Sequence, residues 1–224
     1  MYYYFDIIFI GDLMNNRIKN IIFDIGNVIL NFNINEVLEK FTDNRDEREF
    51  ILKNIINSPE WLGYALIDTG YITRDEAIKM VEDRTNHFND SLVEKFWYSY
   101  NDYAYVDERV LELISFLKEN GYKIYLLSNI NPCTYELVEK SGLFNLVDGY
   151  VLSYKEHQVK PYIGIYKTLL DRYNLVAGES LFIDDKKDNV LSANSLGMLG
   201  ENVLADDFES ILTLLKKYEI INQK

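Results

Sequence analysis

The sequence holds little cysteine, proline or basic charge, and each shortage excludes a class of protein. Cys133 is the only cysteine in 224 residues, so the chain has no intrachain disulfide and no cysteine-rich zinc site. With only three prolines, the sequence contains no stiff linker. A lone thiol fits a reducing compartment, and we therefore expect a cytoplasmic protein.

Acidic residues outnumber basic ones, 36 against 23, and the formal net charge is -13. A surface of this sign repels polyanions, so we expect no nucleic-acid partner. It also repels phosphate esters at long range. An anionic substrate would therefore need a metal ion or a well-placed lysine close by.

Long apolar runs are missing as well. No run reaches the ~18 residues that a membrane-spanning helix needs, so no membrane partner is expected. The aromatic first segment lacks the basic start and the small-residue cleavage site of a signal peptide. We expect residues 1–18 to form an N-terminal extension that is either poorly ordered or an extra edge strand.

Short apolar runs rich in β-branched residues recur along the chain, each followed by polar residues. Runs of this kind are typical of buried strands in a parallel sheet. The first ends at Asp24, just before Gly26. The predicted strands are residues 19–24, 122–127, 148–152, 180–183 and about 200–204.

Between these runs, apolar residues recur at the three- and four-residue spacing of helices. The predicted helices cover residues 106–117, a segment opened by Pro132, and residues 161–173, 189–196 and 207–218. Alternation of strands and helices predicts an α/β protein with a Rossmann-like parallel sheet flanked by helices. In such folds ligands bind at the carboxyl ends of the strands.

One segment, residues 33–103, breaks this alternation because its apolar residues keep helical spacing throughout. We interpret it as an all-helical cap inserted directly after the first strand. The remaining residues, 19–32 and 104–224, then make up the Rossmann-like catalytic core.

Polar residues collect at the predicted strand ends. They are Asp24, Ser128-Asn129, Lys160-Pro161 and Asp184-Asp185. Carboxylates from two strand ends can share one Mg²⁺, which binds carboxylates together with substrate phosphate and water. A carboxylate can attack phosphorus once a metal reduces the repulsion between the anions. Hydroxyl, amide and ammonium groups can hold the phosphoryl oxygens.

These residues lie in four segments that resemble the motifs of haloacid-dehalogenase-superfamily hydrolases. The segments are 23–28 (FDIGNV), 127–129 (LSN), 159–161 (VKP) and 182–189 (FIDDKKDN), with a weaker echo in the cap at 68–73 (DTGYIT). The resemblance is greatest to the alpha-D-glucose-1-phosphate phosphatase-like branch. It implies a Mg²⁺-dependent phosphatase acting on a small phosphorylated metabolite, with a sugar phosphate as the expected substrate.

The resemblance also implies a role for each metal-site residue. Asp24 would be the nucleophile that forms an aspartyl-phosphate, and it would bind Mg²⁺ together with the Gly26 carbonyl and Asp185. Asp184 would stand behind Asp185 or share the metal. Asn189 would hold Asp185 or a metal-bound water.

On the phosphate side, the resemblance implies that Ser128 and Asn129 bind the phosphoryl oxygens. Lys160 would neutralise both Asp24 and the phosphate. The more ordinary interpretations are that Asp24 caps a turn and that the Asp184-Asp185 pair caps the following helix. His87 and His157 are interpreted as surface or packing residues.

The sequence departs from the family pattern at Gly26. Most family phosphatases carry a second Asp at this position, where it protonates the leaving oxygen, and glycine has no side chain that could do so. Three explanations stay open: a more acidic leaving group such as an anomeric hydroxyl, a proton donor from the cap, or water.

Two other functions also stay open at this point. A 2-haloacid dehalogenase-like hydrolase would lack the second Asp too, but it needs no metal, and the Asp184-Asp185 pair argues against it. A catalytically silent phosphate-binding or regulatory protein is suggested only by Gly26. The sequence does not decide between a monomer and a homodimer.

Overall fold

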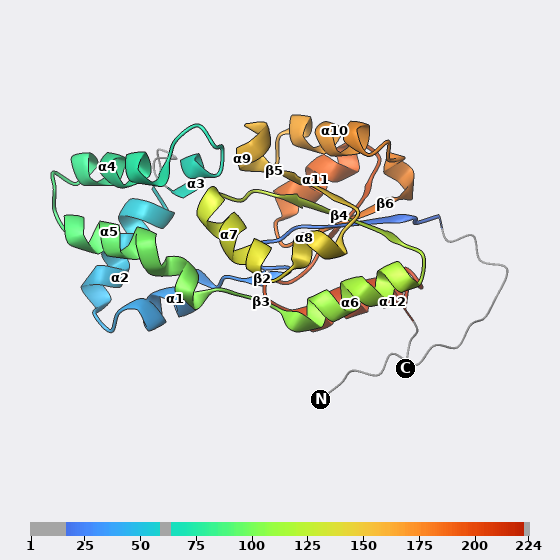
Figure 1. Ribbon diagram of the computed structural model, residues 1–224, viewed down its shortest axis with the longest axis horizontal. Helices are drawn as coiled ribbons and strands as arrows, with labels where there is room; N and C mark the ends of the chain where they lie inside the picture. The colour runs from blue at the N-terminus through green and yellow to red at the C-terminus, as the bar shows by residue number, and fades with distance from the viewer. Residues whose placement is uncertain (1–16, 59–63, 222–224) are drawn as a thin grey trace.

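The computed structural model describes residues 17–58 and 64–221 (Figure 1). At its centre lies a five-stranded sheet in the order β5-β4-β1-β6-β7, and every neighbouring pair of strands is parallel. The central strand β1 therefore has β4 on one side and β6 on the other. The strands are β1 Asn20–Phe23, β4 Lys123–Ser128, β5 Gly149–Leu152, β6 Ser180–Asp184 and β7 Leu199–Asn202.

Alternate side chains of β1 point to opposite faces of the sheet, and each face packs on its own helices. Ile21 and Phe23 belong to the apolar cluster shared with α6 and α12, whereas Ile22 packs with α10 and α11. Figure 1 shows these two pairs of helices on opposite sides of the sheet. The predicted α/β, Rossmann-like fold is confirmed. The helices are α6 Glu108–Glu119, α10 Ile163–Arg172, α11 Lys187–Ser195 and α12 Phe208–Lys217.

Shorter elements fill the remaining connections of the core. Helix α7 begins at Pro132, where the side chain of its N-cap Asn131 accepts a hydrogen bond from Thr134 N at 3.0 Å. Such an N-cap satisfies a backbone N–H that the first turn of a helix leaves unpaired. The elements are α7 Pro132–Lys140, α8 Leu143–Leu146, α9 Ser153–Glu156 and the 3₁₀ turn η3 Ala177–Glu179.

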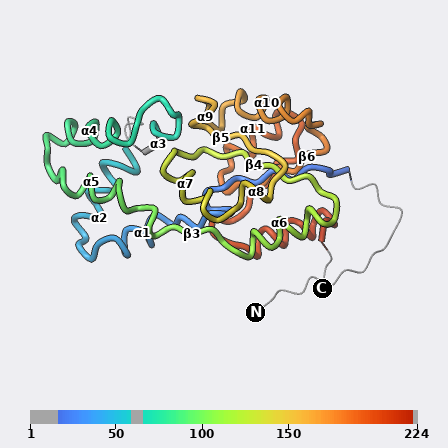
Figure 2. The backbone as a smooth tube through the Cα atoms, in the orientation of Figure 1, coloured from blue at the N-terminus to red at the C-terminus, as the bar shows by residue number. Residues whose placement is uncertain are grey.

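Two short strands absent from the sequence prediction connect the core to the helices inserted after β1. Strands β2 (Leu30–Asn31) and β3 (Tyr105–Val106) pair antiparallel, with Leu30 opposite Val106. Two residues are too few to show an alternating pattern, so no sequence signal marks either strand. Figure 2 shows that the chain enters and leaves the helical region side by side at this ribbon.

Between β2 and β3 the described elements of regular secondary structure are all helices. Their apolar side chains form a separate cluster that includes Val37, Val81, Phe96 and Trp97. Helix α4 begins at a capping box in which Thr73 and Glu76 bond each other's backbone N–H. The limits predicted for the cap stay a prediction. The elements are α1 Ile34–Phe41, α2 Arg45–Ile51, the π-helix η1 Leu52–Ile56, α3 Tyr64–Ile67, α4 Arg74–Arg84, α5 Asp90–Ser99 and the 3₁₀ turn η2 Tyr100–Tyr103.

The turn that follows α3 contacts the core directly. Ser153 Oγ donates a hydrogen bond to the Asp68 carbonyl at 2.6 Å, and His157 Nδ1 lies 3.0 Å from the Thr69 carbonyl. Gly70 has φ +72°, and a Cβ at this position would collide with the Tyr154 carbonyl. The glycine is therefore required here for both its backbone angle and its close approach to the core.

The N-terminal extension predicted at residues 1–18 lies almost wholly outside the described residues, so its order and any edge strand stay predictions. Among the described residues, every helix is too short or too polar to cross a membrane.

Candidate active site

Three carboxylates meet at the carboxyl edge of the sheet. Asp24 directly follows β1, and Asp184 is the last residue of the neighbouring β6. The Asp24 N–H donates to the Ile183 carbonyl at 2.9 Å, which continues the β1–β6 ladder to the site. Oxygen atoms of Asp24, Asp184 and Asp185 all lie within 4.8 Å of one another. The sheet thus gathers acids that are 160 positions apart in the chain.

Lys160 supplies the positive charge between these acids. Its Nζ lies 2.8 Å from Asp24 Oδ1 and 2.6 Å from Asp184 Oδ2. The three residues are almost completely buried, with 3%, 6% and 0% of their surfaces exposed for Lys160, Asp24 and Asp184. Buried charges are tolerated when they are paired and hydrogen-bonded, as they are here.

Asn129 fixes the loop that carries Lys160. Its side chain accepts from the Lys160 N–H at 2.8 Å and donates to the Lys160 carbonyl at 2.9 Å. Ser128, the last residue of β4, is 1% exposed, and its hydroxyl lies 3.4 Å from the Asn129 carbonyl. Both predicted phosphate ligands therefore lie at the end of the strand beside β1. The hold of the Asn129 amide on the lysine loop was not foreseen from the sequence.

Burial and charge shift the pKa values of the central pair. Burial raises the pKa of Asp24 to about 6 against the opposing pull of Lys160, and Asp184 adds to the rise. Burial also disfavours the charged Lys160 ammonium, but Asp184 and Asp24 outweigh this and raise its pKa. At neutral pH the carboxylate of Asp24 and the ammonium of Lys160 prevail, which are the forms that nucleophilic attack requires.

Asp24 holds its two oxygens differently. Oδ1 accepts from both Lys160 Nζ and the Ile25 N–H, the latter at 2.7 Å. Oδ2 accepts no hydrogen bond from the described part of the chain. One oxygen is therefore anchored while the other is free to react.

Asp184 is held by three donors. Besides Lys160, the Lys186 N–H donates to Oδ1 at 2.8 Å, and Asn189 Nδ2 lies 3.0 and 2.9 Å from the two oxygens. The sequence interpretation assigned Asn189 to Asp185 or to a metal-bound water, but the structure places it on Asp184. Helix α11 begins at Lys187, and its first turn brings Asn189 back over the end of β6.

Asp185 has an oxygen that is buried without a partner. Asn27 Nδ2 donates to Asp185 Oδ2 at 3.2 Å, while Asp185 Oδ1 and Asn27 Oδ1 are buried with no hydrogen-bond partner. Burial raises the pKa of Asp185 and Asp184 adds to the rise, although the Asn27 hydrogen bond and the charges of Lys186 and Lys160 oppose it. An unpartnered buried carboxylate oxygen is costly, and a hard divalent cation would satisfy it. The residues present therefore fit Mg²⁺.

Gly26 lies beside this group of acids. A Cβ built on it would meet no atom within 4 Å, so the position where most family phosphatases place a second Asp is open space. Asn27, the next residue, adopts the left-handed region at φ 57°, a conformation that Asn tolerates better than most residues. This backbone turn directs the Asn27 side chain to Asp185.

Two residues near the site, Asp68 and Asn131, were not identified as functional from the sequence. Asp68 follows α3, and its Oδ1 accepts a hydrogen bond from Asn131 Nδ2 at 3.1 Å. Burial raises the pKa of Asp68 to about 7, although the Asn131 bond and the charge of Lys186 oppose the rise. The only sequence signal was the weak cap motif that begins at Asp68.

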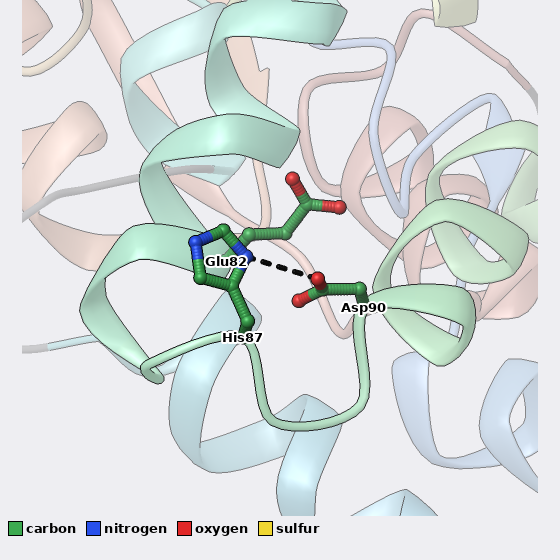
Figure 3. Close-up of side chains that lie close together, drawn as sticks. All are labelled: Glu82, His87 and Asp90. Carbon is green, nitrogen blue, oxygen red and sulfur yellow. Dashed lines mark hydrogen bonds and ion pairs between the residues drawn. The ribbon is translucent and has the colours of Figure 1, made fainter.

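A second group of metal-ligating types occurs between α4 and α5. Glu82, His87 and Asp90 place one ligand atom each within 4.8 Å of one another, and His87 Nδ1 lies 3.0 Å from Asp90 Oδ2 (Figure 3). The His87 side chain is 64% exposed. Figure 1 shows the α4–α5 connection at the end of the helical region farthest from the sheet. The group closes a helix connection in contact with water, and His157 likewise packs at the surface by stacking on Tyr71.

Comparison with protein families gives one family match. The family described as haloacid dehalogenase-like hydrolase matches residues 18–197. The matched region runs from the residues before β1 to the turn after α11, so it includes every residue of the candidate site described above.

Two curated proteins are similar over most of their length. The sesquiterpene phosphatase astK of Aspergillus oryzae is 28% identical over 188 residues, which cover 84% of this chain and 90% of that protein. The D-ribitol-5-phosphate phosphatase of Bacteroides thetaiotaomicron is 27% identical over 193 residues, covering 80% of this chain and 89% of that protein.

Solved structures have a similar fold. A haloacid dehalogenase family enzyme from Bacteroides thetaiotaomicron, crystallised as a mutant with magnesium and inorganic phosphate, is 25% identical. The similarity covers 87% of this chain and 98% of that one, with a TM-score of 0.68. A hydrolase structure from Porphyromonas gingivalis, at 21% identity and a TM-score of 0.69, shows the same fold.

Proposed function

The chain belongs to the haloacid dehalogenase-like hydrolases, and we propose that it hydrolyses a small phosphate monoester, using Asp24 as the nucleophile. The enzyme is a phosphoric monoester hydrolase, in keeping with two curated relatives that are phosphatases. The observation that carries the proposal is the Lys160 ammonium, which contacts Asp24 and Asp184 at 2.8 and 2.6 Å beside the unpartnered Asp185 oxygen.

Asp24 is oriented for attack on phosphorus. Lys160 and the Ile25 N–H hold Oδ1, so Oδ2 can approach the phosphorus atom while the side chain stays fixed. Attack forms an aspartyl-phosphate and releases the alcohol, and water then attacks the phosphorus to regenerate the carboxylate. Because the nucleophile is already held in place, less entropy is lost on reaching the transition state, and the barrier is lower.

The phosphoryl group would be received by groups at the neighbouring strand ends. Ser128 offers a hydroxyl from the end of β4, and Lys160 offers positive charge to the equatorial oxygens. Asn129 keeps Lys160 in place through its two hydrogen bonds and adds its own backbone beside Ser128. These groups favour the charge distribution of the transition state.

Mg²⁺ would be held by Asp24, the Gly26 carbonyl and Asp185. When bound, it supplies the positive charge that lets two anions, carboxylate and phosphate, approach each other. Asp184 keeps its oxygens on Lys160, Asn189 and the Lys186 N–H, so it would support this group from behind. The related magnesium and phosphate complex from Bacteroides thetaiotaomicron supports magnesium as the metal.

The substrate is a small phosphorylated metabolite, and a sugar phosphate is the member of that class we propose. The inserted helices reach the carboxyl edge of the sheet through Asp68, which bonds to Asn131 after β4 and to Ser153 after β5. A cap in this position admits small molecules and keeps large ones out. The D-ribitol-5-phosphate phosphatase among the relatives supports a polyol or sugar phosphate.

Phosphate release from a panel of sugar phosphates, nucleotides and flavin mononucleotide, with Mg²⁺ and with EDTA, tests the proposed function. We expect Mg²⁺-dependent turnover of at least one sugar phosphate and none with EDTA. Metal-independent release of halide from a 2-haloacid would identify a dehalogenase instead. Binding of phosphate analogues without turnover of any ester would identify a silent binding protein.

A further inference from the structure

Alkyl phosphate hydrolysis needs a proton for the leaving oxygen, and the nucleophile loop cannot supply one. Gly26 has no side chain, and the space beside it is open. Lys160 is fixed between two carboxylates that raise its pKa and keep its protons in place. A proton donor supplied by the protein must therefore come from another part of the chain.

The backbone of Asp68 is fixed to the core although the residue follows α3. Ser153 Oγ, at the end of β5, donates to its carbonyl at 2.6 Å. Two residues later, Gly70 packs so closely on the Tyr154 carbonyl that no side chain would fit. These contacts hold Asp68 above the carboxyl ends of β4 and β5, on the edge of the sheet that carries Asp24.

The side chain of Asp68 is held by only one of its oxygens. Asn131 Nδ2 donates to Oδ1 at 3.1 Å, whereas Oδ2 accepts no hydrogen bond within the described ranges. Asn131 is itself fixed, because its Oδ1 accepts from Thr134 N at 3.0 Å and from the Tyr100 hydroxyl at 3.2 Å. A carboxyl group anchored through Oδ1 in this way carries its proton on Oδ2.

We propose that Asp68, reaching the site from the inserted helices, is the general acid that protonates the leaving oxygen. This assignment rests on the proposed phosphatase function and supplies the group that Gly26 lacks. The surrounding charges suit the role. Burial and the nearby Asp24 raise the pKa of Asp68 to about 7, while the Asn131 bond and Lys186 oppose the rise, so a substantial fraction is protonated at neutral pH.

The charged and titratable groups around Asp68 come from both the core and the inserted helical region. Asp24 and Lys186 face it from the core with opposite effects, and the Tyr100 hydroxyl faces it from η2 through Asn131. Burial raises the pKa of Tyr100 beyond the physiological range, so this phenol stays neutral. Asp68, with a pKa of about 7, therefore titrates closer to neutral pH than Asp24, whose pKa is about 6.

The proton balance of both steps is closed. As Asp24 Oδ2 bonds to phosphorus, the bond from phosphorus to the ester oxygen breaks, and that oxygen keeps the electron pair and takes the Asp68 proton. The alcohol leaves, and Asp68 is now a carboxylate. Water then bonds to phosphorus and gives a proton back to Asp68, while the bond to Asp24 breaks and inorganic phosphate forms.

Asp68→Asn, assayed on a sugar phosphate and on p-nitrophenyl phosphate, tests the assignment. Asparagine keeps the shape of the side chain and can still accept from Asn131, but it has no acidic proton. Nitrophenolate leaves without a proton, and kcat/KM reports on the steps up to release of the leaving group, before the hydrolysis step that both substrates share. We therefore expect kcat/KM to fall by roughly 10²–10⁴-fold on the sugar phosphate and by only a few-fold on the aryl ester. The fall of wild-type kcat/KM above pH ~7 on the sugar phosphate should also disappear.

A second substitution makes the test independent of folding. Gly26→Asp has room for its side chain and should restore part of the sugar-phosphate activity of the Asp68→Asn variant. Asp43→Asn, which changes an exposed Asp of the helical region, should leave both activities and both pH profiles unchanged.

Equal losses of kcat/KM on both substrates, or no loss on either, would overturn the assignment and leave Asp68 as a docking or substrate-positioning residue. Failure of the wild-type enzyme to hydrolyse any phosphate ester would instead refute the proposed function. The two outcomes are therefore distinguishable in the same experiment.

Discussion

The two groups of metal-ligating side chains, one at the edge of the sheet and one between α4 and α5, differ in almost everything except their spacing. Each brings three metal-ligating side chains within 4.8 Å. Asp184 of the first is 0% exposed and pairs with a lysine that is itself buried. In the second, His87 is 64% exposed and bonds to Asp90. Water screens the second group, whereas protein dipoles and one ammonium must balance the first.

The difference teaches that proximity of ligating groups is a weak sign of function. Each group holds a buried carboxylate oxygen without a hydrogen-bond partner, Asp185 Oδ1 at the sheet edge and Asp90 Oδ1 between α4 and α5. What differs is the surroundings, because the side chains of His87 and Asp90 are 64% and 38% exposed and close a turn between two helices. Closely spaced ligating groups indicate a functional site when the whole group is buried. Matched substitutions in the two groups test this difference.

The largest contrast is expected from Asp24→Asn against Asp90→Asn. Loss of the nucleophile should lower kcat by roughly 10⁴-fold or more, while Asp90→Asn should stay within about twofold. Asp24→Asn should not lower the melting temperature, because it removes one of several like charges and leaves Lys160 paired with Asp184. Steady-state phosphate release and thermal unfolding check both points. Normal turnover by Asp24→Asn would remove the nucleophile assignment.

Lys160→Met should show the next largest effect, on stability. Removing the ammonium leaves Asp24 and Asp184 buried without a cation, which costs about 3–5 kcal/mol of unfolding free energy. The matched control is Lys123→Met, because Lys123 is 62% exposed in its pair with Asp148, and an exposed pair contributes about 0–1 kcal/mol. Urea unfolding measures both. Similar losses in the two variants would mean that burial does not distinguish the pairs.

Asp185→Asn is expected to weaken Mg²⁺ binding by about tenfold or more, because a charged oxygen ligand becomes neutral. The Mg²⁺ concentration giving half-maximal activity should rise accordingly, and calorimetric titration should show the same change without substrate. Glu82→Gln in the exposed group is the control and should leave both values unchanged. A rise in the control alone would place the functional cation between α4 and α5.

The smallest effect is expected from His87→Asn. Asn tolerates the left-handed backbone that His87 adopts at φ 58°, so the turn is kept while the imidazole is removed. The unfolding free energy should change by less than about 0.5 kcal/mol, and the Mg²⁺ dependence should not change. A clear loss of activity would show that the group of Glu82, His87 and Asp90 has a function after all.

Much of the core was predictable because local patterns determine it. The buried runs, the polar residues at their ends and the motif order predicted the sheet and located Asp24, Lys160 and Asp185, and the family resemblance is confirmed. Strands of two residues, such as β2 and β3, carry too little pattern to be recognised. The roles of the site residues stay predictions until they are tested.

Contacts between segments far apart in the chain could not be predicted from the sequence. Asp68 and Asn131 are 63 positions apart, and neither shows a periodicity that points to the other. The bond from Asn189 to Asp184 depends on how α11 leaves β6, and a motif gives only the spacing of those residues. The one local signal was the weak cap motif at residues 68–73, which contains both Asp68 and Gly70.

The narrow ribbon of β2 and β3 has a consequence for which substrates this enzyme can turn over. The chain crosses between core and inserted helices there in both directions. Asp24 lies in the core and Asp68 in the inserted helices, so nucleophile and acid come together only where the contacts of residues 68–70 with Ser153, Tyr154 and His157 hold the helices on the core. A substrate too bulky for these contacts to form would meet the nucleophile without the acid and would react slowly even if it bound. The enzyme would then select substrates by size through the reaction rate rather than through binding affinity.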